Sequence, residues 1–413
     1  MSELNKVNHR KILICFIRFF ILTFFIILIV LNRKCDVKGQ EYNIIYNKND
    51  ETTGSTFKDS DGDDNVYDML IEDEDYSDID KLLKNSDYNK SFKEMINDIY
   101  NNSTQSYKLK DVLSGISDVI NANKKAMIQT VIIALISSMI TSFGPLFNNR
   151  QLSDISVNVI TIGLITLLTT VYFGAVNTAC EILNILIGAY KSLCVIFFPS
   201  VTLTSGSITS ASYYQIVIFM ITGVDIFMKN VLIRANDAMM MISLCDCVDK
   251  EEHFTKMCEI IDKWIRISGK IILSVFLGLN GIKSIVNPVT DSVKGSYFNK
   301  ALSLIPGVGN QATVISNSIM GAATMVKNSI GTAGIIALIA ISLQPLLKLV
   351  ALSVIYQGIA AVIEPMSDKR VVKAISMLSR AIGNLTYIVL IALVLMVITM
   401  AIICLATNIN YLS

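Results

Sequence analysis

The stretch AAVIEPMSDKRVVKA, residues 360–374, joins two apolar parts of the chain through a short charged turn. The first part ends at Glu364-Pro365, because proline cannot continue a helix and disfavours helical geometry in the residue before it. Three charged residues follow at 368–370, and apolar sequence resumes soon after them. Two interpretations are open at this point: a catalytic acid with its partners, or the place where a membrane helix meets water.

Composition favours the membrane. Of the 413 residues 52% are hydrophobic and only 17% are charged, and the mean hydropathy is +0.54. In a soluble protein about a quarter of the residues are charged. Apolar windows of about twenty residues, enough to cross a hydrocarbon core, recur along the chain. The composition therefore predicts an all-α polytopic membrane protein with roughly five to eight membrane-embedded helices.

The N-terminal part differs from the rest. Residues 1–35 predict a signal peptide or, because no small-residue cleavage site follows the apolar core, an uncleaved signal anchor. Residues 36–80 predict an acidic, partly disordered exported linker, and 81–125 predict amphipathic helices that are exported or lie on the membrane surface. Residues 50–98 carry sixteen acidic side chains and five lysines, a net charge of −11. The multi-span membrane domain is expected at 126–408.

Within that domain the apolar stretches are separated by charges, prolines and glycines. We expect apolar segments at 126–147, near 154–174, and at 180–203, 213–235, 271–287, 333–363 and 384–407. A glycine-rich stretch at 302–335 is a poor free-standing span and is expected to be re-entrant or tightly packed. The run TSGSITSAS at 204–212 fits either close interhelical packing or an ordinary polar loop.

Two stretches mix apolar and charged residues. Asp225 and Lys229 lie inside an apolar segment at a spacing of four, so they are expected to neutralise each other on one helix face. Residues 251–270 predict an interfacial amphipathic helix. Its expected apolar stripe consists of Phe254, Met257, Cys258, Ile261, Trp264, Ile265 and Ser268.

No catalytic or metal-binding set assembles from the sequence. The chain has two histidines, no nucleotide-binding glycine motif and no arrangement that suits a nucleophile and its base. Its eight cysteines show no disulfide framework, and the close pair Cys245 and Cys247 has too few neighbouring ligands for zinc. The prediction is a protein without enzymatic activity, metal, cofactor or nucleic-acid partner.

Two functional classes remain open on these residues alone. A secondary transporter is favoured by apolar segments that contain charges and Gly/Pro interruptions. A channel or assembly component, whose function is to pack against other subunits, is favoured by the absence of a convincing inverted repeat and by the signal sequence followed by a long acidic arm.

The order of several motifs resembles the stage III sporulation protein AE family of endospore-forming bacteria. The motifs are TSGSITSAS at 204–212, LIPGVGN at 304–310, GAATMVKNSIGTAGIIALI at 321–339 and LLKLVALSVIYQGIAAVIEPMSDKRVV at 346–372. The resemblance covers roughly residues 105–408. The residues that carry it, expected to serve packing or docking, are Gly206, Pro306, Gly307, Gly309, Lys348, Tyr356, Glu364, Pro365, Asp368, Lys369 and Arg370.

This resemblance implies a function. Members of the family sit in the mother-cell membrane that engulfs the forespore and belong to a secretion-like channel that keeps the forespore competent for late gene expression. The implied partners are the other membrane proteins of the stage III sporulation A operon, the forespore stage II sporulation protein Q through the assembled complex, and the lipid bilayer.

The opening turn can then be interpreted by its charge. Four basic residues between 369 and 380, against Asp368 alone, give a net charge of +3. The positive-inside rule places such a loop in the cytoplasm, here on the mother-cell side. The basic residues either set the topology or form a docking surface for a cytoplasmic partner, and neither role makes Glu364 a catalytic acid.

Overall fold

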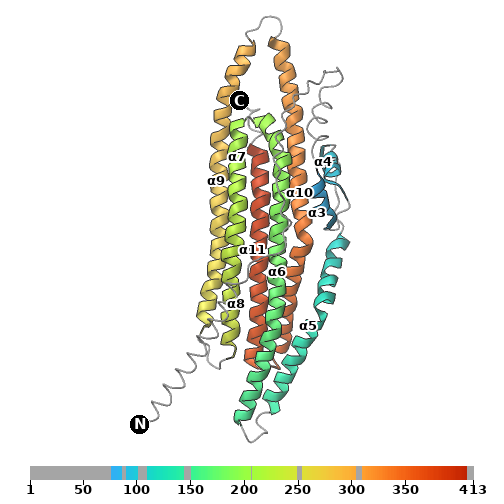
Figure 1. Ribbon diagram of the computed structural model, residues 1–413, viewed down its shortest axis with the longest axis vertical. Coiled ribbons are helices and arrows are strands. Elements are labelled where there is room, and N and C mark those ends of the chain that lie inside the picture. Colours follow the sequence, from blue (N-terminus) through green and yellow to red (C-terminus); the bar gives the residue numbers. More distant parts are fainter. Residues whose placement is uncertain are drawn as a thin grey trace, which may run out of the picture.

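The computed structural model describes residues 76–85, 90–100, 109–143, 150–205, 207–248, 254–303 and 309–406, whose regular structure is helical. The long helices run side by side in one elongated bundle (Figure 1). The helices are α3 Ser77–Asn85, α4 Phe92–Tyr100, α5 Leu109–Phe143, α6 Arg150–Ser205, α7 Ser207–Gly223, the π-helical segment η2 Val224–Ile233, α8 Arg234–Asp246, α9 Thr255–Ser303, α10 Gly309–Ile363 and α11 Lys369–Ala406.

The bundle helices are longer than one membrane requires. Helix α6 has 56 residues, α10 has 55 and α9 has 49. At about 1.5 Å per residue α6 is roughly 84 Å long, against about 30 Å for a hydrocarbon core. In the described residues, four stretches are long and apolar enough to cross a membrane: Asn158–Thr202, Ser210–Asp246, Ala323–Ile363 and Lys369–Leu405.

Neighbouring segments that the sequence predicts as separate are joined in the structure. The segments near 154–174 and at 180–203 form the single helix α6, in which Pro199 is internal. The glycine-rich stretch and the apolar stretch after it form α10, so a re-entrant segment at 302–335 is wrong from Gly309 onward. In apolar surroundings every backbone group needs an internal partner, and a continuous helix provides it. The expected count of five to eight is therefore not confirmed.

Two further boundaries differ in the same way. Helix α9 continues through Asn287-Pro288 to Ser303, so the apolar segment at 271–287 is part of a longer helix. Helix α5, Leu109–Phe143, joins the predicted amphipathic helix near 109–120 to the first predicted span. The expected end of that span at Gly144-Pro145 lies outside the described residues.

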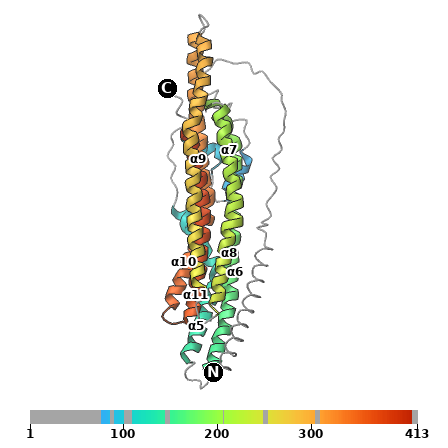
Figure 2. The same ribbon diagram turned by 90° about the vertical axis from the view of Figure 1, so that its left-hand side faces the viewer.

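Helix α11 forms the centre of the bundle. It packs against α10, α6, α9 and α8, and the views in Figures 1 and 2 place it between α9 and α10. Gly331 on α10 allows a close approach, because a Cβ atom there would lie 2.1 Å from the Cys404 Sγ of α11 and 3.1 Å from the Phe197 ring of α6. The three helices meet at this position.

Helices α3 and α4 pack onto the side of the bundle, against α10 and α6. Their inward side chains are buried: Tyr76, Ile79, Leu83, Phe92, Met95 and Ile96. The Asp80 carboxylate accepts a hydrogen bond of 2.6 Å from the Phe92 backbone N–H and joins the two helices. The helical spacing predicted for α4 is confirmed. Helix α3 begins at Ser77, inside the predicted linker, whereas residues 1–75 lie outside the described part.

The predicted charge pair within the apolar segments is also present. The Lys229 ammonium on η2 donates to the Asp225 carboxylate and to the side-chain oxygen of Asn184 on α6. The pair is thus neutralised on its own helix, as the spacing of four predicts.

Candidate functional site

The turn between α10 and α11 begins where the sequence places it. The chain leaves α10 after Ile363, whose carbonyl accepts hydrogen bonds from the backbone N–H groups of Met366 and Ser367, both 2.9 Å long. Asp368 then caps α11, because its carboxylate accepts the Arg370 backbone N–H at 2.9 Å. A side-chain acceptor at this position satisfies an N–H that has no partner within the helix.

The turn is tied to the neighbouring helices. The Arg370 guanidinium donates to the side-chain oxygen of Asn158 on α6 at 2.6 Å and to Asp368 at 3.3 Å. The Ser367 hydroxyl donates to the Ala134 carbonyl of α5 at 3.2 Å, and the Ser138 hydroxyl donates to the Met366 carbonyl. The turn therefore fixes the ends of α10 and α11 against α5 and α6.

Its basic side chains fall into two groups. Lys369 and, further along α11, Arg380 are exposed, as is the acidic Glu364, and all three are accessible to a partner. Arg370 and Lys373 are held in contacts: the Lys373 ammonium donates to the Asp246 carboxylate at the end of α8 and to the Thr255 hydroxyl of α9, both at 2.9 Å. Only the exposed group can contribute to docking or to electrostatic attraction at the surface.

A second polar site lies inside the bundle. The Tyr172 hydroxyl of α6 donates to the Asp237 carboxylate of α8 at 2.7 Å. The Asn236 amide donates to the Tyr172 hydroxyl at 3.0 Å and to the Ala381 carbonyl of α11 at 2.9 Å. The three polar side chains are buried and connect three helices.

Asn384 extends this network to α9. Its amide donates to the side-chain oxygen of Asn236 at 3.2 Å and to the Asp262 carboxylate at 2.7 Å. Its side-chain oxygen accepts a hydrogen bond of 3.1 Å from the Arg266 guanidinium, which lies over the Tyr387 ring at 5.7 Å. We call these residues, Tyr172, Asn236, Asp237, Asp262, Arg266 and Asn384, the polar network.

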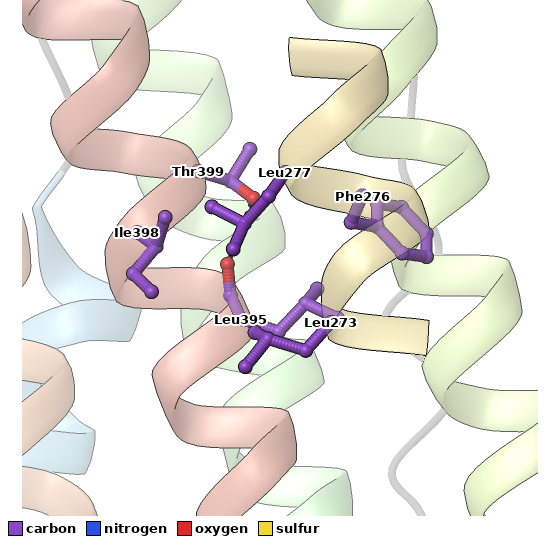
Figure 3. Close-up of a pocket in the computed structure, with 6 residues that line it drawn as sticks. All are labelled: Leu273, Phe276, Leu277, Leu395, Ile398 and Thr399. Carbon is purple, nitrogen blue, oxygen red and sulfur yellow. Dashed lines mark hydrogen bonds between the residues drawn. The ribbon is translucent and has the colours of Figure 1, made fainter. Parts of the chain in front are cut away.

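The arrangement can hold four helices in register, because its hydrogen bonds join side chains of α6, α8, α9 and α11. In the part of the chain that the structure describes, no group of three or more histidines, cysteines and carboxylates could hold a metal ion. An apolar hollow between α9 and α11 is lined by Leu273, Phe276, Leu277, Leu395, Ile398 and Thr399 (Figure 3). The Thr399 hydroxyl donates to the Leu395 carbonyl, so this hollow offers a ligand no free donor.

The residues singled out from the sequence do not form one site. The structure brings Asp368 and Arg370 together at the turn, where Glu364, Pro365 and Lys369 also lie. Lys348 is exposed on α10, and Tyr356 is fully buried on the same helix. Gly309 is the first residue of α10. Gly206, Pro306 and Gly307 lie outside the described residues.

The polar network was missed by the sequence reasoning. The expected segments 213–235 and 384–407 put Asn236, Asp237 and Asn384 at or beyond their ends. The structure includes all three in the longer apolar stretches Ser210–Asp246 and Lys369–Leu405, where polar residues are costly and usually have partners. In contrast, the expected apolar stripe of residues 251–270 is divided. Cys258, Ile265 and Ser268 are buried against the bundle, whereas Met257 and Trp264 are exposed.

Two comparisons with known proteins match most of this chain. A family model described as stage III sporulation protein AE matches residues 89–407. Stage III sporulation protein AE of Bacillus subtilis (strain 168) is 19% identical over 276 residues, which are 66% of this chain and 69% of the relative. No solved structure matches the chain. The matched region extends from α4 to α11 and contains both the turn and the polar network.

Proposed function

Because the chain belongs to the stage III sporulation protein AE family, we propose that it is an integral membrane component of the sporulation-specific, secretion-like channel between mother cell and forespore. The observation that carries the proposal is the family match over the apolar bundle, whose described residues include four stretches long and apolar enough to cross a membrane. In this role the protein is needed for late forespore development and gene expression, and it has no catalytic task.

The proposal includes a location and partners. The protein lies in the mother-cell membrane around the forespore. It assembles there with the other membrane proteins of the stage III sporulation A operon and, through the complete assembly, with the forespore stage II sporulation protein Q. The net charge of residues 368–380, the turn and the first part of α11, supports a cytoplasmic, mother-cell position for the turn between α10 and α11.

An in-frame deletion in the native spore-former tests this function. We expect engulfment to finish, after which the forespore shrinks and a late forespore reporter stays dark under the microscope. Normal sporulation together with an uptake defect in growing cells would instead favour a secondary transporter. That alternative is supported by the polar network, because carboxylates inside an apolar bundle are typical of ion-coupled transport.

Charge reversal at the turn tests the role of its basic residues. We expect Lys369→Glu with Arg370→Glu to disturb membrane insertion or assembly, measured by membrane protein levels, reporter fusions for topology and spore counts. Arg370→Glu alone should already lower protein levels, since it loses the contact to Asn158 and places a second acid beside Asp368. Lys369→Glu leaves these contacts intact and isolates the surface charge. Normal levels, topology and sporulation in the double variant would contradict this prediction.

A further inference from the structure

Helix α9 presents three different faces along its first half. One face packs on the bundle through Cys258 and Ile265, which are buried. A second face is apolar and exposed, with Ile260 and Ile267 67% and 54% exposed. The third face consists of exposed charged residues at intervals of three or four, which we call the basic stripe: Lys256, Glu259, Lys263, Arg266 and Lys270.

Hydrogen bonds fix the level of the basic stripe in the bundle. At one end, Lys373 of α11 contacts Thr255 of α9. Three residues earlier on α11, Arg370 contacts Asn158 of α6. At the other end, Arg266 reaches Tyr172 of α6 through Asn384 and Asn236 of the polar network. Residues 255–266 of α9 therefore lie at the same level as residues 158–172 of α6.

At that level α6 is compatible with lipid. It carries no charged residue from 155 to 180, and its outward side chains include Val159 and Ile162, which are 64% and 52% exposed. The exposed hydroxyls of Thr166 and Thr170 donate to carbonyls of their own helix. Helix α5 continues this surface with Ile128, Ile132, Leu135, Ile136 and Met139. Figure 1 shows α5 and α9 at opposite edges of the bundle.

The basic stripe does not suit lipid at the same level. From Lys256 to Lys270 it extends about 21 Å along the helix, whereas a headgroup layer is only about 5–8 Å thick. Lysine side chains can reach a nearby interface, but a run of this length cannot lie within one such layer. Among the described residues Lys256, Lys263 and Lys270 have no ion-pair partner, so the bundle does not neutralise them. One edge of the bundle thus suits lipid, whereas the basic stripe at the opposite edge suits water.

We propose that the basic stripe of α9 lines one wall of an aqueous pathway for small anions. This inference rests on the proposed function and adds the class of solute to it. The basic stripe has four basic residues and one acid, and its Arg266 is paired with Asp262 at 3.4 Å. A net charge of +2 remains when Asp262 is included, and a positive surface raises the local concentration of anions. The three lysines follow one another at intervals of seven residues, about 10 Å, and successive weak sites of this kind favour passage over retention.

Residue-resolved thiol labelling tests the proposal in the full chain reconstituted in liposomes. The variants are Lys263→Cys on the basic stripe and Ile162→Cys on α6 at the same level. Each is treated with a negatively or a positively charged methanethiosulfonate, and the modified peptide is identified by mass spectrometry, so that the native cysteines are distinguished. Lys263→Cys should react. The ratio of its labelling rate with the anionic reagent to that with the cationic reagent should be several-fold higher than the same ratio for free cysteine. Ile162→Cys should not react.

Two controls address the charge. Raising the salt from about 0.05 M to about 1 M should remove most of the anion preference at Lys263→Cys. The triple variant Lys256→Gln, Lys263→Cys, Lys270→Gln should also show a reduced anion preference, while the level of folded protein stays unchanged.

Three outcomes would overturn the inference. Equal labelling at both sites would show that this part of the bundle lies outside the bilayer, and no labelling at Lys263→Cys would show that lipid or protein covers the basic stripe. Labelling at Lys263→Cys without a preference for the anionic reagent would contradict the proposal that the solutes are anions. None of these outcomes concerns the sporulation defect of the deletion strain, which tests the proposed function separately.

Discussion

Asn384 is the residue on which the polar network depends, because it contacts side chains on both α8 and α9. Asn384→Ala would leave oxygens of Asn236 and Asp262 without this donor. We expect the free energy of unfolding to fall by about 1–3 kcal/mol. The measurement is a denaturation curve in mixed detergent with increasing dodecyl sulfate. The control is Thr386→Ala, whose hydroxyl only donates to the Ile382 carbonyl of its own helix. Equal losses in both variants would argue against a stabilising network.

Cys247 provides a test of burial outside the membrane-crossing segments. Burial raises the pKa of its thiol from 9.0 to about 12, and it also raises the pKa of Cys258. The reactive thiolate is then about a thousandfold rarer at pH 8 than in the unfolded chain. We expect iodoacetamide to label Cys247 slowly in the folded protein and readily after denaturation. Similar rates in both states would contradict the burial.

The same shift gives a pH dependence. Between about pH 9 and pH 12 the unfolded thiol loses its proton while the folded thiol keeps it, so the free energy of unfolding should fall as the pH rises through this range.

At this scale, local pairs could be predicted and distant ones could not. Asp225 and Lys229 are four residues apart, and their pairing follows from helix geometry alone. Asn384 and Asp262 meet only because α9 and α11 pack together, over a separation of 122 residues. The sequence does not pair them, since Asp262 is one of several charged residues in the stretch 251–270 and Asn384 is the first residue of the expected apolar segment 384–407.

At the scale of elements, two glycines of α10 should respond to alanine with opposite signs. Gly331→Ala places a methyl group against Cys404 and Phe197, and such overpacking costs about 1–3 kcal/mol. A Cβ atom at Gly358 would have no neighbour within 4 Å, so Gly358→Ala should stabilise the helix by about 0.5–1 kcal/mol. The unfolding curves of the two variants should move in opposite directions, and a shared direction would contradict the packing described at Gly331.

The ends of helices were easier to predict than their continuity. Glu364-Pro365 marks a real end, because proline cannot continue α10 and polar residues follow at 367–370. Pro199 and Pro345 lie inside helices, where apolar neighbours leave the backbone no better partner than the next helical turn. A window of twenty residues cannot separate these cases, which is why the segments were counted as distinct spans.

At the scale of the molecule, α3 and α4 attach the N-terminal region to the bundle. Leu83 is fully buried where α3 packs on the bundle, so Leu83→Asp should detach α3. We expect trypsin to cleave after Lys81 and Lys84 about tenfold faster, since cleavage requires the segment to open. The control is Ser77→Asp, which adds the same charge at an exposed position of α3. Unchanged cleavage in Leu83→Asp would contradict the docking of α3.

The composition predicted the class of protein, a helical membrane protein, but not how charged and apolar surfaces are distributed around the bundle. Hydropathy and low charge predict a helical membrane protein. The sequence shows a charged side of residues 251–270 and suggests a helix lying flat on the membrane. Only the contacts between helices place the basic stripe of α9 opposite an uncharged surface.

The length of the bundle has a mechanical consequence. If one membrane surrounds about 30 Å of α6, roughly 50 Å of the helix extends beyond it. Such a projection acts as a lever arm. A change of about 10° in the tilt of the embedded part, within the range that bilayer thickness imposes, would move the far end sideways by about 9 Å. A small change of tilt within the bilayer thus becomes a larger displacement of the far end of α6, where another structure can contact it.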